Sequence, residues 1–188
     1  MILAIDPGNE YSAYVLLNDD MSLIEGAKVE NKEMLNIFDD YTTDANLEKL
    51  TDGIEGMAEE LHIAIEMIAS YGMAVGKSVF DTCVFIGQLK QIAEQKGFKV
   101  TYIYRKDEKM TICNSMKAKD SNIRQALIDE YAKFDFKNGK GTKANPDTFY
   151  GFKADMWAAF AVGHTYKEMY LEKSRVHRSV RWIWRMAT

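Results

Sequence analysis

The sequence has no long apolar run, few cysteines and no excess of positive charge. No segment is long and apolar enough to span a bilayer, and Asp6 interrupts the first apolar run too early for a secretory signal peptide. We therefore expect a cytoplasmic protein with no membrane partner. The two cysteines, Cys83 and Cys113, have neither CxxC spacing nor a nearby histidine, which favours reduced core thiols over a disulfide or a zinc site.

The net charge of -4 is unevenly distributed along the chain. From residue 171 onward Glu172 is the single acid, and five basic residues raise that tail to +4: Lys173, Arg175, Arg178, Arg181 and Arg185. The remainder of the chain then carries -8. A global field of this sign repels nucleic acid, so any binding to DNA must come from local patches.

A chain of 188 residues, 47% hydrophobic and 28% charged, has the size and composition of one folded domain. It contains no internal repeats. We expect a domain over 1–170 and a basic, Trp-containing tail over 171–188.

Apolar periodicity predicts an α/β fold. A hairpin is expected over 2–17, where an apolar run ends at Asp6 and returns after Pro7-Gly8, and a third strand over 22–29. The remaining predicted elements are listed here: helix 44–60, strand 61–67, helix 74–96, strand 98–104, helix 120–134, a flexible loop 136–146 and helix 153–170. Segments 31–43 and 105–116 stay undecided. A strand–helix–strand crossover implies parallel pairing beside the hairpins.

This order is the outline of the ribonuclease H-like fold: a mixed five-stranded sheet, three antiparallel strands then two parallel, flanked by helices. Asp6 alone is equally well an ordinary strand-turn residue. Glu66, however, ends another strand, and Asp155 lies near the start of the last helix. Metal-binding carboxylates stand at these positions of the fold. Carboxylates that converge repel one another, and a hard cation such as Mg²⁺ offsets that repulsion.

Several motifs resemble one family. They are Ala4-Ile5-Asp6-Pro7-Gly8, Ala64-Ile65-Glu66, Gly76-Lys77-Ser78-Val79, Lys119-Asp120-Ser121-Asn122-Ile123-Arg124-Gln125-Ala126-Leu127 and Lys153-Ala154-Asp155-Met156-Trp157-Ala158-Ala159. In this order they resemble the RuvC-type Holliday junction resolvases, and more closely their bacteriophage relatives, over roughly residues 1 to 170.

The resemblance implies a magnesium-dependent endonuclease of DNA recombination and repair that cuts branched DNA, with Mn²⁺ as a substitute ion. Asp6, Glu66 and Asp155 would be its catalytic metal ligands. The family commonly places a second acid three residues after the helical one, where this chain has Ala158. The second metal position is then weakened, changed by design, or completed by another acid such as Asp147.

The resemblance also implies DNA contacts. Lys109, Lys117 and Lys119 follow the fifth strand, Arg105 precedes them, and Tyr71 lies in a segment where resolvases carry an aromatic wedge. For each of these residues an ordinary solvated surface role is the alternative. The helix around 74–96 would form a homodimer, because two strands are cut symmetrically; packing on its own sheet is the alternative.

Two other functions compete with a nuclease. One is a non-catalytic module that binds DNA junctions and has lost full metal coordination at Ala158. The other is the actin and sugar-kinase fold, which also opens on a strand, a turn and an acid, but which has more glycines in its hairpin than the single Gly8 found here.

Overall fold

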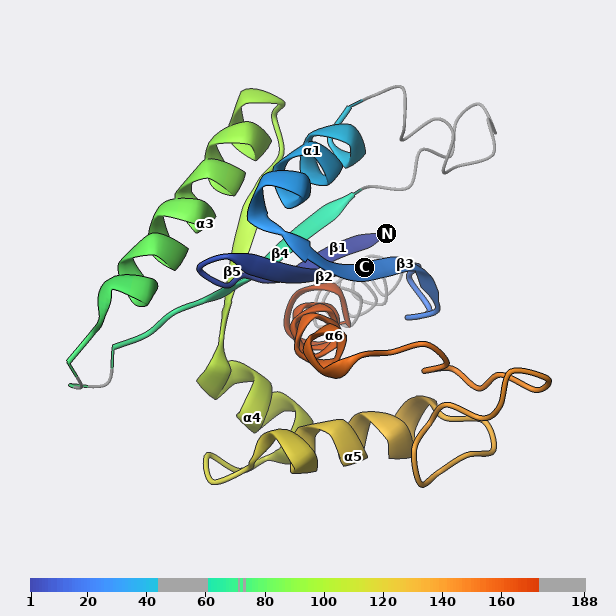
Figure 1. Ribbon diagram of the computed structural model, residues 1–188. Coiled ribbons are helices and arrows are strands. Elements are labelled where there is room, and N and C mark those ends of the chain that lie inside the picture. Colours follow the sequence, from blue (N-terminus) through green and yellow to red (C-terminus); the bar gives the residue numbers. More distant parts are fainter. Residues whose placement is uncertain (44–60, 71, 73, 173–188) are drawn as a thin grey trace, which may run out of the picture.

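The computed structural model describes residues 1–43, 61–70, 72 and 74–172, and these build on a five-stranded sheet (Figure 1). The strands are β1 (Ile2–Asp6), β2 (Tyr11–Leu17), β3 (Leu23–Glu30), β4 (His62–Met67) and β5 (Val100–Tyr104). Their order is β3-β2-β1-β4-β5. The hairpins pair antiparallel, whereas β4 is parallel to both β1 and β5. The predicted mixed sheet is thus confirmed.

Helices cover both faces of the sheet (Figure 1). One face carries α1 (Asn31–Tyr41) and α3 (Lys77–Gln95). The other carries α6 (Ala154–Tyr166), followed by the π-helical turn η1 (Lys167–Glu172), with α4 (Arg105–Cys113) and α5 (Asp120–Tyr131) packed beyond it. The two undecided segments therefore contain α1 and α4. The predicted helix 44–60 lies outside the described residues.

Side-chain alternation in β1 divides the core in two. Ile2 and Ala4 face α6 together with Ala64 of β4, whereas Leu3 and Ile5 face the side of α1 and α3. Because β1 is buried on both faces, its sequence is an unbroken apolar run up to Asp6. The same alternation points Asp6 toward α6.

Gly163 brings α6 close to the sheet. A Cβ added at this position would lie 2.7 Å from Cδ1 of Leu17 and 3.2 Å from Cβ of Ala4. Both contacts are shorter than ordinary van der Waals distances. The absence of a side chain at 163 therefore sets how near α6 approaches β1 and β2.

The segment between α5 and α6 is an ordered loop and not the flexible one that its Gly, Lys and Asn content predicts. The buried carboxylate of Asp147 accepts hydrogen bonds from the backbone N–H groups of Lys133, Phe134, Asp135 and Thr148 at 2.7–3.0 Å. Asp135 in turn accepts from the N–H groups of three later residues of the loop. Two carboxylates thus fix its path.

Among the described residues, no helix has the length and apolar character that a bilayer crossing requires. Cys83 and Cys113 are both free and half-buried, so neither belongs to the fully buried core that the sequence suggested for them.

Candidate active site

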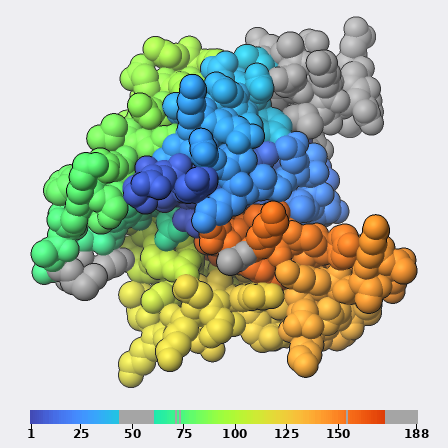
Figure 2. All heavy atoms as spheres, viewed as in Figure 1, coloured from blue at the N-terminus to red at the C-terminus, as the bar shows by residue number. Residues whose placement is uncertain are grey.

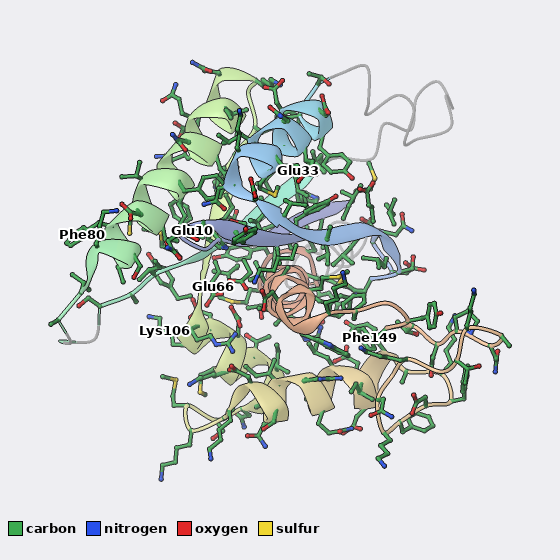
Figure 3. The ribbon with its side chains drawn as sticks, viewed as in Figure 1. Glu10, Glu33, Glu66, Phe80, Lys106 and Phe149 are labelled. Carbon is green, nitrogen blue, oxygen red and sulfur yellow. The ribbon has the colours of Figure 1, made fainter. Side chains whose placement is uncertain are left out.

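Asp6 and Glu66 lie side by side at the ends of two parallel strands. The β1–β4 register pairs Ala4 with Ala64 and Ile5 with Ile65, so its next step brings Asp6 beside Glu66. Both point to the α6 face, and Figure 3 shows Glu66 between the sheet and α6. Burial, the negative charge of Glu66 and a hydrogen bond shared with Glu66 raise the pKa of Asp6 to about 8. This corner of the sheet therefore concentrates carboxyl groups whose negative charges oppose one another.

The turn after Asp6 is held by a small polar network. The backbone N–H of Gly8 donates to Oγ of Ser12 at 3.2 Å, and the Ser12 hydroxyl donates to Oδ1 of Asn31 at 2.7 Å. The amide of Asn31 returns to the carbonyl oxygen of Gly8 at 2.9 Å. A Cβ on Gly8 would lie 2.3 Å from the carbonyl oxygen of Tyr11. Hydrogen bonds and close backbone packing thus fix the turn that follows Asp6.

Asp155 reaches the same corner from the first turn of α6. Its negative charge also acts on Asp6, though less than that of Glu66. Asp155 forms an ion pair with Lys28 of β3, and its hydrogen bond and charge raise the pKa of the lysine. Sequence reasoning missed Lys28. The signal was the hairpin register, which pairs Asp6 with Ala13 and Ala13 with Lys28 in one row across the sheet.

The three predicted acids line a cavity of about 560 Å³. Its other walls come from α4, α5 and α6, and include Arg105, Arg124 and Ala158. On the surface, the β1–β2 hairpin, α6 and α4 adjoin one another on a single face (Figure 2). The cavity therefore brings the three acids together with two arginines in its wall.

Glu108 is a fourth acid near this corner, and the sequence did not single it out. It lies in the first turn of α4, its side chain is 0% exposed, and it forms an ion pair with Arg105. Burial and the charge of Glu66 raise its pKa to about 8, against the opposing effect of Arg105. Its Oε1 is buried and accepts no hydrogen bond from the described residues.

The residues predicted to contact DNA fall into different environments. Arg105 lines the cavity and pairs with both Glu108 and Asp120. Lys117 and Lys119 are exposed in and after the α4–α5 turn, Lys109 is half-buried on α4, and none of the three is among the residues that line the cavity. Tyr71 lies outside the described residues.

Asp147 does not complete the site. Its oxygens accept four backbone hydrogen bonds in the loop before α6, and it does not line the cavity. Although burial opposes this, the N–H groups of Asp135, Lys133 and Phe134 hold its pKa below the usual range. The hypothesis that it replaces the acid missing at Ala158 is wrong, because its ligand oxygens are already used.

The acids at this corner fit a divalent cation. The donors are carboxylate oxygens, which Mg²⁺ and Mn²⁺ prefer, and Oε1 of Glu108, which lies outside the cavity lining, has no hydrogen-bond partner among the described residues. Among described residues, a separate group, Glu130, His164 and Glu168, has one ligand atom each within 4.8 Å of the others. It contains none of the cavity acids, and Nδ1 of His164 already bonds the Tyr131 hydroxyl at 2.8 Å.

No family model and no curated protein matches the chain. Two solved structures of RuvC from Thermus thermophilus are similar to it. One is a complex with a Holliday junction substrate, 12% identical with a TM-score of 0.55, matched over 88% of this chain and 91% of that one. The other is 15% identical with a TM-score of 0.54, over 89% and 95%. The chain thus has the ribonuclease H-like fold seen in RuvC.

Proposed function

We propose that the protein is a metal-dependent endonuclease that hydrolyses phosphodiester bonds in branched DNA such as Holliday junctions. The observation that carries this proposal is the register of β1 and β4, which brings Asp6 beside Glu66 under Asp155 in one open cavity. The fold is that of a protein solved with a Holliday junction. The bacteriophage subfamily, the cytoplasmic location and the division at residue 170 rest on the sequence alone.

Asp6, Glu66 and Asp155 would hold Mg²⁺, or Mn²⁺ in its place. The bound metal would supply water activation and charge stabilisation for an in-line displacement at phosphorus. The fold would position the three ligands. Strands β1 and β4 fix Asp6 and Glu66, and the first turn of α6 carries Asp155. Lys28 balances the charge of Asp155 at the rim.

The basic residues would bind the DNA backbone. Arg124 lies in the cavity wall, with its guanidinium over the ring of Trp157 at 4.6 Å from the centroid. Lys117 and Lys119 lie exposed next to this wall, where phosphates beyond the cleaved one would pass. Contacts of this kind read backbone shape, so we expect selectivity for DNA structure and little for sequence.

A homodimer through α3 would place two such sites on one junction. Phe80 and Val84, one helical turn apart, are 59% and 64% exposed. Figure 3 shows Phe80 on the side of α3 that faces away from the sheet. An apolar pair of this size on an open helix face supports a protein interface at this position.

The alternative function is a junction-binding module without catalysis. Ala158 favours it, because Ala158 lines the cavity where the family commonly has a second helical acid.

Cleavage of a synthetic four-way junction separates the two functions. We expect the wild-type protein to nick the junction in Mg²⁺ or Mn²⁺, and the variant Asp6→Asn to bind it without cutting. Asp40→Asn, an exposed acid on α1 at the opposite face of the sheet, is the matched control and should cut normally. Wild-type protein that binds the junction but never nicks it in either metal would leave only the binding module.

A further inference from the structure

The α6 side of the cavity offers one carboxylate, where the resemblance leads us to expect two. Asp155 and Ala158 both line the cavity and are three residues apart on one helix face. An alanine methyl has no ligand atom, so this wall offers a single carboxylate. A site that is to hold a divalent ion tightly therefore needs a further oxygen from another element.

Glu108 is the acid whose surroundings differ from those of a structural residue. Its side chain is 0% exposed, and a buried carboxylate is costly unless its oxygens are paired. Arg105 pairs with Oε2, but Oε1 has no hydrogen-bond partner although it is buried. The described residues leave half of this carboxylate unsatisfied.

The position of Glu108 links it to the cavity. The charges of Glu66 and Asp6 both act on Glu108. Its partner Arg105 lines the same cavity as Ala158, and α4, which carries both residues of the pair, packs against α6. Glu108 itself is not among the residues that line the cavity, and its link to this corner is the ion pair with Arg105.

The charged groups at this corner also favour a bound cation. Four carboxylates act at this corner, those of Asp6, Glu66, Asp155 and Glu108, and Arg105 and Lys28 are the cations paired with them among described residues. Arg105 is also shared with Asp120. A divalent cation bound here would offset the repulsion between carboxylates that raises the pKa of Asp6 and Glu108.

We propose that Glu108 supplies the carboxylate that Ala158 lacks, with its unpaired oxygen directed to the metal position and its other oxygen held by Arg105. This inference rests on the proposed function, since it completes the same site. It makes Arg105 a positioning residue: the guanidinium orients Glu108 through Oε2 and leaves Oε1 available.

Titration of metal-free protein with MnCl₂ in a calorimeter, without DNA, tests the proposal. We expect Glu108→Gln to weaken Mn²⁺ binding by about tenfold or more, the range known for altered metal-site partners. Asp6→Asn should weaken it at least as much. Two controls should bind as the wild type does: Glu33→Gln on α1, and Glu130→Gln in the separate His164 group.

Thermal unfolding supplies a readout that a structural role would not give. The Glu108→Gln variant keeps an oxygen for Arg105, so without metal it should melt no more than about 2 °C below the wild type. Its stabilisation by Mn²⁺ should shrink. A purely structural Glu108 predicts the reverse: a lower melting temperature without metal and an unchanged response to Mn²⁺.

Two further variants test the proposal in case the Glu108→Gln protein does not fold. Glu108→Asp keeps the charge and the Arg105 pair but is one methylene shorter, and should still weaken Mn²⁺ binding. Adding Ala158→Asp to Glu108→Gln should restore it, because the acid returns to the α6 wall.

The outcomes are distinguishable. If Asp6→Asn loses Mn²⁺ and the Glu108 variants do not, the role of Glu108 is overturned while the nuclease proposal stands. If Glu130→Gln alone loses the ion, or the wild type binds none, the metal site proposed at Asp6 fails and the role of Glu108 fails with it.

Discussion

Two buried acids in this protein have opposite surroundings. Asp147, 5% exposed, lies in the loop before α6 and accepts four backbone hydrogen bonds. Glu108, 0% exposed, lies beside the cavity and has one partner side chain, Arg105. Both are removed from water, yet the pKa of Asp147 is lowered while burial raises that of Glu108 to about 8. The fold satisfies the carboxylate of Asp147 with its own backbone, whereas among the described residues it leaves one oxygen of Glu108 without a partner.

The largest effect should come from removing the one partner of Glu108. Arg105→Gln leaves a buried acid without its counter-charge, which costs about 3 kcal/mol and lowers the melting temperature by about 6–12 °C. Mn²⁺ should restore part of this loss, and so should the second change Glu108→Gln. Differential scanning calorimetry in EDTA and in Mn²⁺ measures both. An Arg105→Gln protein as stable as the wild type would contradict this account of the pair.

Asp147→Ala should also destabilise the protein, but without any link to metal. Four N–H groups lose their acceptor, so we expect the melting temperature to fall by about 5 °C or more. The increment that Mn²⁺ adds should equal that of the wild type. Asp40→Ala, which removes an exposed acid, is the control with little effect. A changed Mn²⁺ increment would mean that the loop and the cavity are coupled.

Acid should remove the contribution of Asp147 in a defined direction. Its pKa in the folded protein is lower than that of an unfolded aspartate, about 3.9. The stabilisation is therefore complete above that value and declines as the pH falls toward the folded pKa. Urea unfolding at a series of pH values should show wild type and Asp147→Asn converging below about pH 4. A constant difference down to about pH 2 would refute the assignment.

The smallest effect concerns Lys28 at the rim. Its ion pair with Asp155 is partly exposed, with 45% and 38% of the two side chains accessible, so Lys28→Gln should leave the melting temperature almost unchanged. Because Lys28 competes with a cation for Asp155, Mn²⁺ should bind up to about fivefold more tightly in the variant. Calorimetric titration measures the change. Weaker binding would show that Lys28 supports the ion instead.

The strands and two of the acids were predictable because their signals are local. An apolar run that stops at Asp6 and another that stops at Glu66 mark strand ends directly, and parallel pairing then brings them together. Asp155 was predicted from its position near the start of the last helix. Ala158 was visible as a position where the resemblance led us to expect an acid.

What the sequence did not show depends on tertiary packing. Segment 105–116 has no apolar period, because α4 turns charged residues both to solvent and to the cavity, so neither the helix nor Glu108 could be inferred. Lys28 meets Asp155 only after two hairpin registers are known. Asp147 could pass for a spare ligand, since four backbone donors cannot be identified from residue types.

The missing side chain at Gly163 has a consequence far from its own position. Eight residues separate it from Asp155 on the same helix, which is about 12 Å along the axis. A helix of this length moves as a rigid body. A side chain added at 163 would push α6 away from β1 and β2. Asp155, at the other end of the helix, would then move away from Asp6. The position of Asp155 relative to Asp6 thus depends on a glycine that is not part of the cavity lining.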